Sequence, residues 1–271
     1  MSARPSLAQA PSFQATAWQM TYGERLAFEG LLAQLKPTLA IEIGTAEGGS
    51  LARIAEHSAE VHSFDLVAPS FEVADHVTLH PGDSHAELPR FLAQLAAEGR
   101  HPDFVLVDGD HSAEGVQQDV EDLLASDAIT ECVIVLHDTI NEEVRAGLEA
   151  VDWTSFAKVR YVDLDAVPGR MVVSDHVARR GALWGGLGLA IVSTEHRFAT
   201  PLEGVLRTNV VSPTRIGLGV RALLGDDVAE ESDVEAVVAA LRPQTPAPRV
   251  RDLAAQTLAA AAASARRRLR G

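Results

Sequence analysis

One stretch near the start of the chain limits its fold more than any other. Residues 39–43 are apolar apart from Glu42, and a glycine-rich turn leads from them into an amphipathic helix that opens at Ser50. Strand, tight turn and helix in this order are typical of the first unit of a doubly wound α/β domain. Glycine lets the backbone approach a ligand closely, and a helix start offers unpaired N–H groups. The turn is therefore a candidate binding site.

The alternation of strand and helix continues along the chain. Further apolar strands are predicted at residues 61–65, 76–80, 104–107, 132–136, 159–164 and 187–193. Helical spacing of apolar residues predicts helices at residues 21–35, 50–57, 88–97, 112–124 and 142–150. Continuous apolar strands between helices indicate a buried, mostly parallel sheet with helices on both faces. We therefore expect a Rossmann-like α/β fold.

The pattern also divides the chain into three parts. Residues 20–194 form the expected α/β domain, and residues 1–19 are a lead rich in Ala, Ser, Pro and Gln that we expect to be disordered or loosely packed. Residues 195–271 are predicted as a mostly helical extension, with a Pro-rich linker at 243–248 and an Ala- and Arg-rich helix at 249–269. That last helix either docks on a second copy of the chain or lies in solvent.

Composition excludes several classes of protein. Of the 271 residues, 46% are hydrophobic and 23% are charged, and no apolar run approaches the roughly 20 residues that a membrane span needs. The net charge of −15 argues against a nucleic-acid surface, which requires a basic patch. The single cysteine, Cys132, rules out an internal disulfide, and residues 1–14 contain no apolar core of a secretory signal. We expect a cytoplasmic protein.

Acidic residues lie at or just after the ends of five successive predicted strands. They are Glu42, Asp65, Asp83, Asp108 with Asp110, and Asp138. One such acid would mean little, because Asp commonly caps helices. In a doubly wound sheet, however, ligands bind at the carboxyl ends of the strands. Five acids at those ends indicate a functional site.

Two of these acids, Asp65 and Asp83, suit a nucleoside. Asp65 follows Gly44 by 21 residues, a separation that suits a carboxylate accepting hydrogen bonds from both ribose hydroxyls. Asp83, which precedes Ser84, is placed to accept from an adenine amino group. The alternatives are a helix or turn cap for Asp65 and an Asx-turn for Asp83. The turn itself has Ala46 where a dinucleotide fingerprint needs glycine.

The motifs after the fourth and fifth strands favour a cation. Asp108 and His111 belong to an Asp-Gly-Asp-His sequence, and His137 and Asp138 follow the neighbouring strand. Two carboxylates and a histidine suit a divalent cation that keeps open positions, and His111 could then take a proton from a substrate hydroxyl. The alternative for each histidine alone is a partly buried hydrogen-bonding residue.

These motifs resemble those of class I S-adenosyl-L-methionine-dependent methyltransferases. The sequence is most similar to small-molecule and sugar O-methyltransferases, whose signature is D-G-D/S-H after strand four and an acidic pair after strand five. The similarity runs over residues 20–193 and is carried by residues 42–50, 107–111 and 136–139. It implies a seven-stranded sheet whose last strand, residues 187–193, is antiparallel. It also implies a cofactor site made by Glu42, Gly44, Thr45, Ala46, Gly48, Ser50, Asp65, Asp83, Ser84 and Asp108.

The resemblance further implies a role for each residue of the cation site. Asp108 ligates magnesium, His111 is the base, and His137 and Asp138 supply further ligands. Relatives commonly carry Glu-Asp, Asp-Asp or Asp-Asn in that last pair, so His137 is a departure. Histidine is a poor magnesium ligand, so the sequence leaves open whether the cation is Mg²⁺ or another divalent ion. Asp110 is an alternative ligand.

The function expected from the sequence is methyl transfer from S-adenosyl-L-methionine to a hydroxyl of a sugar or small metabolite, with assistance from a divalent metal. One alternative is an NAD(P)-dependent oxidoreductase. Ala46, where a dinucleotide fingerprint needs glycine, and the acids after strands four and five argue against this alternative. The other is a non-catalytic nucleoside-binding protein. The residues that shape the acceptor site should come from the N-terminal helix and from residues 168–186.

Overall fold

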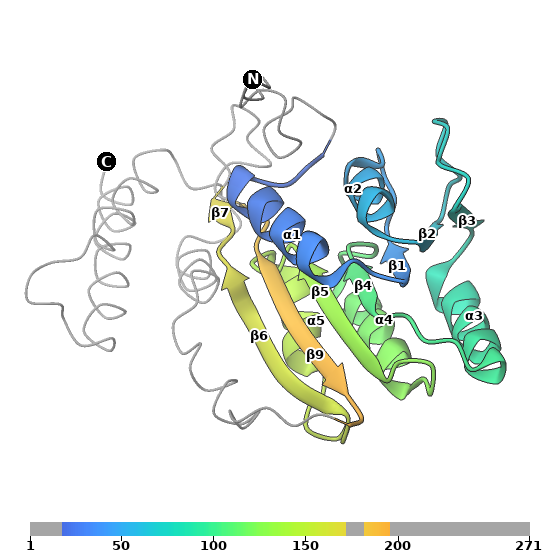
Figure 1. Cartoon of the computed structure of the whole chain (residues 1–271). Coiled ribbons are helices and arrows are strands. Elements are labelled where there is room, and N and C mark those ends of the chain that lie inside the picture. Colours follow the sequence, from blue (N-terminus) through green and yellow to red (C-terminus); the bar gives the residue numbers. More distant parts are fainter. Residues whose placement is uncertain (1–17, 172–181, 196–271) are drawn as a thin grey trace, which may run out of the picture.

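The computed structural model describes residues 18–171 and 182–195 (Figure 1). The predicted extension with its linker at 243–248 and its terminal helix lies outside the described residues. In the part of the chain that the structure describes, no helix has the length and apolar character needed to cross a membrane.

A seven-stranded sheet forms the centre of the molecule. Its strands are β1 (Leu39–Ile43), β2 (Glu60–Asp65), β3 (Val77–Pro81), β4 (Phe104–Val107), β5 (Glu131–His137), β6 (Val159–Val167) and β9 (Leu187–Ser193). Their order is β3-β2-β1-β4-β5-β9-β6, and β9 runs antiparallel to both of its neighbours. This confirms the predicted Rossmann-like sheet with one antiparallel strand. A separate two-stranded ribbon pairs β7 (Arg170–Met171) with β8 (Leu183–Trp184).

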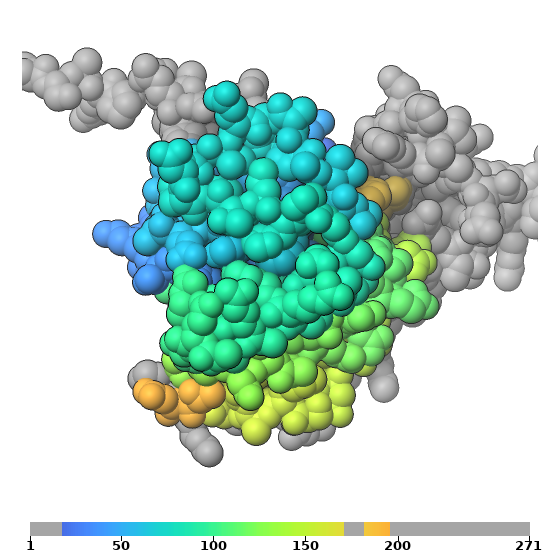
Figure 2. All heavy atoms as spheres, turned by 90° about the vertical axis from the view of Figure 1, so that its right-hand side faces the viewer, coloured from blue at the N-terminus to red at the C-terminus, as the bar shows by residue number. Residues whose placement is uncertain are grey.

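Helices cover both faces of the sheet. They are α1 (Tyr22–Leu35), α2 (Gly49–His57), α3 (Ser84–Glu98), α4 (Ala113–Ala125) and α5 (Glu142–Ala150). Helices α1 and α2 lie on one face, and α3, α4 and α5 lie on the other (Figure 1). Their apolar side chains belong to two separate core clusters. Figure 2 views the molecule from the side of β3, where residues 66–76, β3 and α3 form much of the surface. Each face therefore has its own apolar layer, as a doubly wound domain requires.

The largest N-terminal differences from the sequence prediction are at α3 and at the start of the domain. Helix α3 begins at Ser84 rather than at residue 88, because Asp83 caps it by accepting a hydrogen bond from the N–H of His85 at 3.1 Å. The packed chain also includes Trp18, two residues before the expected domain start; it is 4% exposed and meets the Phe28 ring edge-on. The Asp83 cap thus lengthens α3, and the contact of Trp18 with Phe28 adds Trp18 to the packed domain.

The sheet register brings the predicted site residues together. Strand β4 is parallel to both β1 and β5, with Val107 paired to Ile43 on one side and to Leu136 on the other. The residues that follow these three positions therefore meet at one edge of the sheet. Gly44 is confined there: it has a φ of 93°, and a Cβ atom on it would lie 2.0 Å from the carbonyl oxygen of Asp108. Only glycine fits at this crossing.

Candidate active site

A cavity of about 640 Å³ opens at this edge of the sheet. Its walls come from the glycine turn, the start of α1, the ends of β4 and β5, and the β7–β8 ribbon. The lining includes Gly44, Thr45, Ala46, Ser50, Asp108, His111, His137 and Asp138. Ligand pockets commonly have volumes of about 300–1,000 Å³, so the cavity can hold a cofactor-sized molecule.

The glycine turn leaves the start of α2 open toward a ligand. Ala46 and Gly48 both have positive φ angles, of 43° and 76°. Gly48 is the N-cap of α2 and provides no side-chain hydrogen bond to the first turn. Unpaired N–H groups at a helix start attract anions, and the carboxylate of an amino-acid moiety is such a group. The backbone geometry therefore suits a small anionic group here.

Glu42 lies beneath the turn and does not line the cavity. It is fully buried; Ser50 Oγ donates to its Oε1 at 2.6 Å and Ser63 Oγ donates to its Oε2 at 2.6 Å. Burial raises the pKa of Glu42 to about 8, and the two serine hydrogen bonds offset only part of that effect. Glu42 thus connects β1, α2 and β2 and supports the turn from below.

The side chain of Asp65 holds the backbone of the glycine turn. Its Oδ2 accepts hydrogen bonds from the N–H groups of Thr45 at 2.8 Å and Ala46 at 2.9 Å. Burial acts to raise the pKa of Asp65, but N–H donors including those of Ala46, Val67 and Thr45 outweigh it and lower the pKa. Asp65 does not line the cavity. Its predicted contact with a ribose stays a prediction.

The loop before α3 is occupied by local contacts. Asp83 caps α3, and Ser84 Oγ donates to Oδ1 of Asp119 at 3.2 Å. Asp119 is fully buried on α4, and burial raises its pKa to about 6. Neither Asp83 nor Ser84 lines the cavity. Their role toward an adenine is likewise a prediction, and Asp119 is a buried acid beside them that the sequence pattern did not single out.

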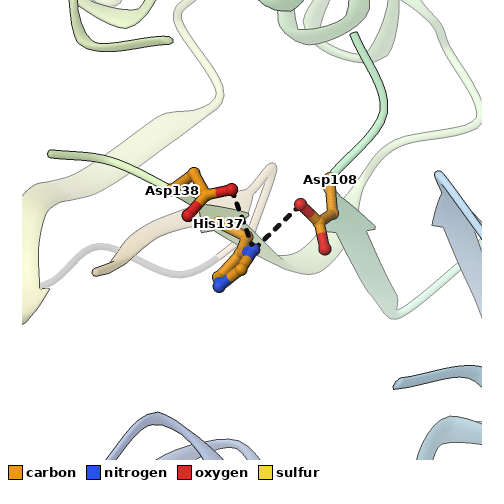
Figure 3. Close-up of side chains that lie close together, drawn as sticks. All are labelled: Asp108, His137 and Asp138. Carbon is orange, nitrogen blue, oxygen red and sulfur yellow. Dashed lines mark hydrogen bonds and ion pairs between the residues drawn. The ribbon is translucent and has the colours of Figure 1, made fainter. Parts of the chain in front are cut away.

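Asp108, His137 and Asp138 converge as the sequence predicted. Each offers a ligand atom, and the three atoms lie within 4.8 Å of one another. Nδ1 of His137 lies 2.8 Å from Oδ1 of Asp108 and 3.6 Å from Oδ2 of Asp138 (Figure 3). Asp138 has a φ of 54°, in the left-handed region, which non-glycine residues seldom adopt. Two carboxylate oxygens and one imidazole nitrogen around one point fit a divalent cation.

His111 lies at the rim of this cluster. Its Nε2 is 2.9 Å from Oδ2 of Asp138 and 3.6 Å from Oδ1 of Asp108. The nearby carboxylates of Asp108 and Asp138 raise the pKa of His111 to about 9. Trp184, from the β7–β8 ribbon, meets the His111 ring edge-on with centroids 5.6 Å apart. The imidazole therefore faces the cavity between two carboxylates and an aromatic wall.

Asp110 is turned away from the cluster. It is exposed, and its Oδ1 accepts a hydrogen bond from the N–H of Ser112 at 2.8 Å. His137, which is 5% exposed at the end of β5, lies in the cluster with Asp108 and Asp138 instead. Of these two candidate ligands, the geometry favours the histidine.

The cavity lining also includes residues from outside the predicted set, among them Glu24, Arg170 and Trp184. Glu24 is buried in the first turn of α1, where Thr21 and Glu24 form a capping box. That Thr-x-x-Glu pattern is readable in the sequence, but it signals only a helix start. Arg170 and Trp184 pair across the β7–β8 ribbon, and no sequence motif marks them.

Burial acts to raise the pKa of Glu24, yet contacts with His137 and Thr21 lower it to about 2. For His137, burial acts to lower the pKa, but Asp108, Glu24 and Asp138 raise it well above the usual value. The centre of the site is thus a histidine surrounded by carboxylates.

Residues 41–139 match the model of a protein family described as a methyltransferase domain. This part of the chain carries a methyltransferase domain. The match begins in β1 and ends just after Asp138, so it contains the turn and all of the predicted ligands. It confirms the resemblance to class I S-adenosyl-L-methionine-dependent methyltransferases, with the seven-stranded sheet that this resemblance implies. No curated protein matches the sequence.

Solved structures similar to the methyltransferase domain were also found. One is the MycE methyltransferase of the mycinamycin biosynthetic pathway in complex with Mg, SAH and mycinamycin VI, with 14% identity, coverage of 70% of this chain and 55% of that chain, and a TM-score of 0.45. Another is the O-methyltransferase from Bacillus cereus in complex with SAH, with 15% identity, coverage of 62% and 79%, and a TM-score of 0.41. The chain thus spans little more than half of the MycE structure, and the assignment rests on the family match.

Proposed function

We propose that this methyltransferase moves the methyl group of S-adenosyl-L-methionine to a hydroxyl of a sugar or another small metabolite, with a divalent cation held by Asp108, His137 and Asp138. The observation that carries the proposal is the position of that cluster. It shares one cavity with the open glycine turn, and His111 lines the same cavity. Cofactor, cation and base would therefore meet at a single acceptor hydroxyl.

The glycine turn would hold the cofactor. The positive φ angles of Ala46 and Gly48 expose the backbone, and the open start of α2 suits the carboxylate of the methionine moiety. Asp65 keeps the turn in this conformation through the N–H groups of Thr45 and Ala46. S-adenosyl-L-methionine supplies a methyl group on a sulfonium, which needs no further activation by the protein.

The remaining residues would prepare the acceptor. Methyl transfer forms a bond from the hydroxyl oxygen to the methyl carbon while the carbon–sulfur bond breaks, and the hydroxyl proton passes to a base. His111 is the imidazole placed to take that proton. A bound cation would lower the pKa of the hydroxyl and offset the carboxylate charge that otherwise keeps His111 protonated. Trp184 beside His111 offers an apolar face to the acceptor.

The test uses labelled S-adenosyl-L-methionine, Mn²⁺ or Mg²⁺, and a panel of sugars and small hydroxylated metabolites. We expect methyl transfer to at least one hydroxyl, loss of transfer after chelation, and recovery on adding the cation. Asp138→Ala should reduce transfer at least a hundredfold. Activity that survives exhaustive chelation, with Asp138→Ala near the wild type, would remove the cation from the proposal.

The alternatives give different results in the same experiments. A nicotinamide-dependent oxidoreductase would bind NADH, and the methyltransferase match leaves that alternative without support. A non-catalytic nucleoside-binding protein would bind the cofactor without turnover over the whole acceptor panel. The cluster of Asp108, His137 and Asp138 favours catalysis over simple binding, because a nucleoside needs no cation ligands.

A further inference from the structure

A buried carboxylate lies behind His137, away from the other two ligands of the cluster. Glu24 belongs to α1, and its side chain is 1% exposed. Its Oε1 lies 3.6 Å from Nε2 of His137. The other ring nitrogen, Nδ1, faces Asp108 and Asp138, and Figure 3 shows the second nitrogen pointing away from both carboxylates. The imidazole thus stands between a ligand cluster and a third acid.

Nε2 of His137 depends on that acid. It is buried, and no group among the described residues makes a hydrogen bond to it. A buried donor without an acceptor destabilises the folded state. The 3.6 Å separation from Glu24 is an ion-pair distance, longer than a hydrogen bond. Glu24 is therefore the carboxylate positioned to accept a hydrogen bond from the Nε2–H group of His137.

The backbone holds Glu24 in this position. The N–H of Thr21 donates to Oε2 of Glu24 at 2.5 Å, and the N–H of Gly186 donates to Oε1. The preceding amide, that of Gly185, donates to Oδ1 of Asp138 at 2.5 Å. Two successive backbone amides of one turn thus hold Asp138 and Glu24, the acid behind His137.

That turn requires glycine. Gly185 and Gly186 have φ angles of 80° and 90°, in the region that side chains disfavour. A Cβ atom on Gly185 would lie 2.7 Å from Oε1 of Glu24. The backbone of this turn therefore packs closely against the Glu24 carboxylate. Glu24 is held by the amide of Thr21 on one side and by this turn on the other.

We propose that Glu24 is a positioning residue that makes His137 a cation ligand. By accepting a hydrogen bond from the Nε2–H group, it selects the tautomer in which Nδ1 carries a free lone pair toward Asp108 and Asp138. Histidine ligands of metals usually donate their second ring N–H to such an acceptor, which fixes the ring and increases its basicity. The inference rests on the proposed function, since it requires that a divalent cation binds at this cluster.

The test is a calorimetric titration of Mn²⁺ into the full chain, with Glu24→Gln as the variant. We expect Mn²⁺ affinity to fall at least tenfold, because loss of such an acceptor typically costs about 10–100-fold in metal affinity. Glu29→Gln is the matched control: Glu29 lies on the same helix and pairs with Arg53 and His57 of α2 instead. It should leave Mn²⁺ affinity within twofold of the wild type.

A second measurement needs no substitution. Long-range ¹H–¹⁵N correlation spectra of the wild-type chain loaded with Zn²⁺ report which nitrogen of His137 keeps its proton. The expected result is a protonated Nε2 and a zinc-bound Nδ1. A protonated Nδ1, or an Nε2 without its proton, overturns the proposal. This result decides the matter even if Glu24→Gln does not fold.

The outcomes separate this inference from the proposed function. If the wild type binds Mn²⁺ and Glu24→Gln binds it within twofold, the role of Glu24 is wrong and the cation site stands. If the wild type binds no Mn²⁺, the cation site and the role of Glu24 both fail. A parallel titration with S-adenosylhomocysteine then shows whether the cofactor site still holds.

Discussion

Replacing Glu42 with glutamine should change how the stability of the fold depends on pH. The carboxyl is fully buried, and burial raises its pKa from 4.5 to about 8. Because the folded-state pKa lies above the unfolded value, the unfolded chain releases this proton first as pH rises. Glu42 therefore lowers the free energy of unfolding between about pH 4.5 and pH 8, and the effect is complete above that window.

The size of the effect follows from the shift. A difference between a pKa of 4.5 and one of about 8 corresponds to about 5 kcal/mol over the whole window, at 1.36 kcal/mol per pH unit. Between pH 5.5 and pH 7.5 the expected change is about 2.5 kcal/mol. Glutamine resembles the protonated acid: it can accept from Ser50 and donate to Ser63. Its advantage over the wild type should therefore grow by that amount across the two pH units.

Urea unfolding followed by tryptophan fluorescence at several pH values measures this difference. Glu56→Gln is the control, since Glu56 lies on α2 with its side chain 56% exposed and should give a nearly constant difference. A Glu42→Gln difference that stays flat between pH 5.5 and pH 7.5 would refute the reasoning. It would mean that Glu42 is ionised in the fold and that the serine hydroxyls outweigh burial.

Two further substitutions test the turn. Asp65→Ala removes the acceptor of the Thr45 and Ala46 N–H groups. The affinity for S-adenosylhomocysteine, measured by calorimetry, should fall at least tenfold, which is about 1.4 kcal/mol. Unchanged affinity would show that the turn keeps its conformation without Asp65. Gly44→Ala places a Cβ atom 2.0 Å from the carbonyl oxygen of Asp108 at a φ of 93°, and the free energy of unfolding should fall by at least about 2 kcal/mol in urea; a loss below about 0.5 kcal/mol would contradict the close approach.

The sequence predicted the sheet and the convergence of Asp108, His137 and Asp138, because both follow from the local pattern of apolar strands and the residues at their ends. Strand β4 is an uninterrupted apolar run, and Asp108 follows it directly. Parallel pairing with β5 then places His137 beside Asp108 without any knowledge of side-chain packing. The fold and the Asp108, His137 and Asp138 cluster could accordingly be found from strand ends and strand order alone.

The residues that support the site could not be found in this way. Glu24 reaches His137 only because α1 packs over the carboxyl end of β5, and the packing of a helix on a sheet depends on many distant side chains. The Gly185–Gly186 turn contributes backbone amides, which have no signature in a sequence. Ala46 at a φ of 43° shows the same limit, since its left-handed conformation comes from the turn and the hydrogen bonds to Asp65, and alanine does not prefer it.

Titration of S-adenosylhomocysteine into the full chain by calorimetry tests the central claim most directly, because it requires no knowledge of the acceptor. The account predicts binding of one molecule per chain and no heat of binding with NADH under the same conditions. A folded protein that binds neither S-adenosylhomocysteine nor S-adenosyl-L-methionine would contradict it.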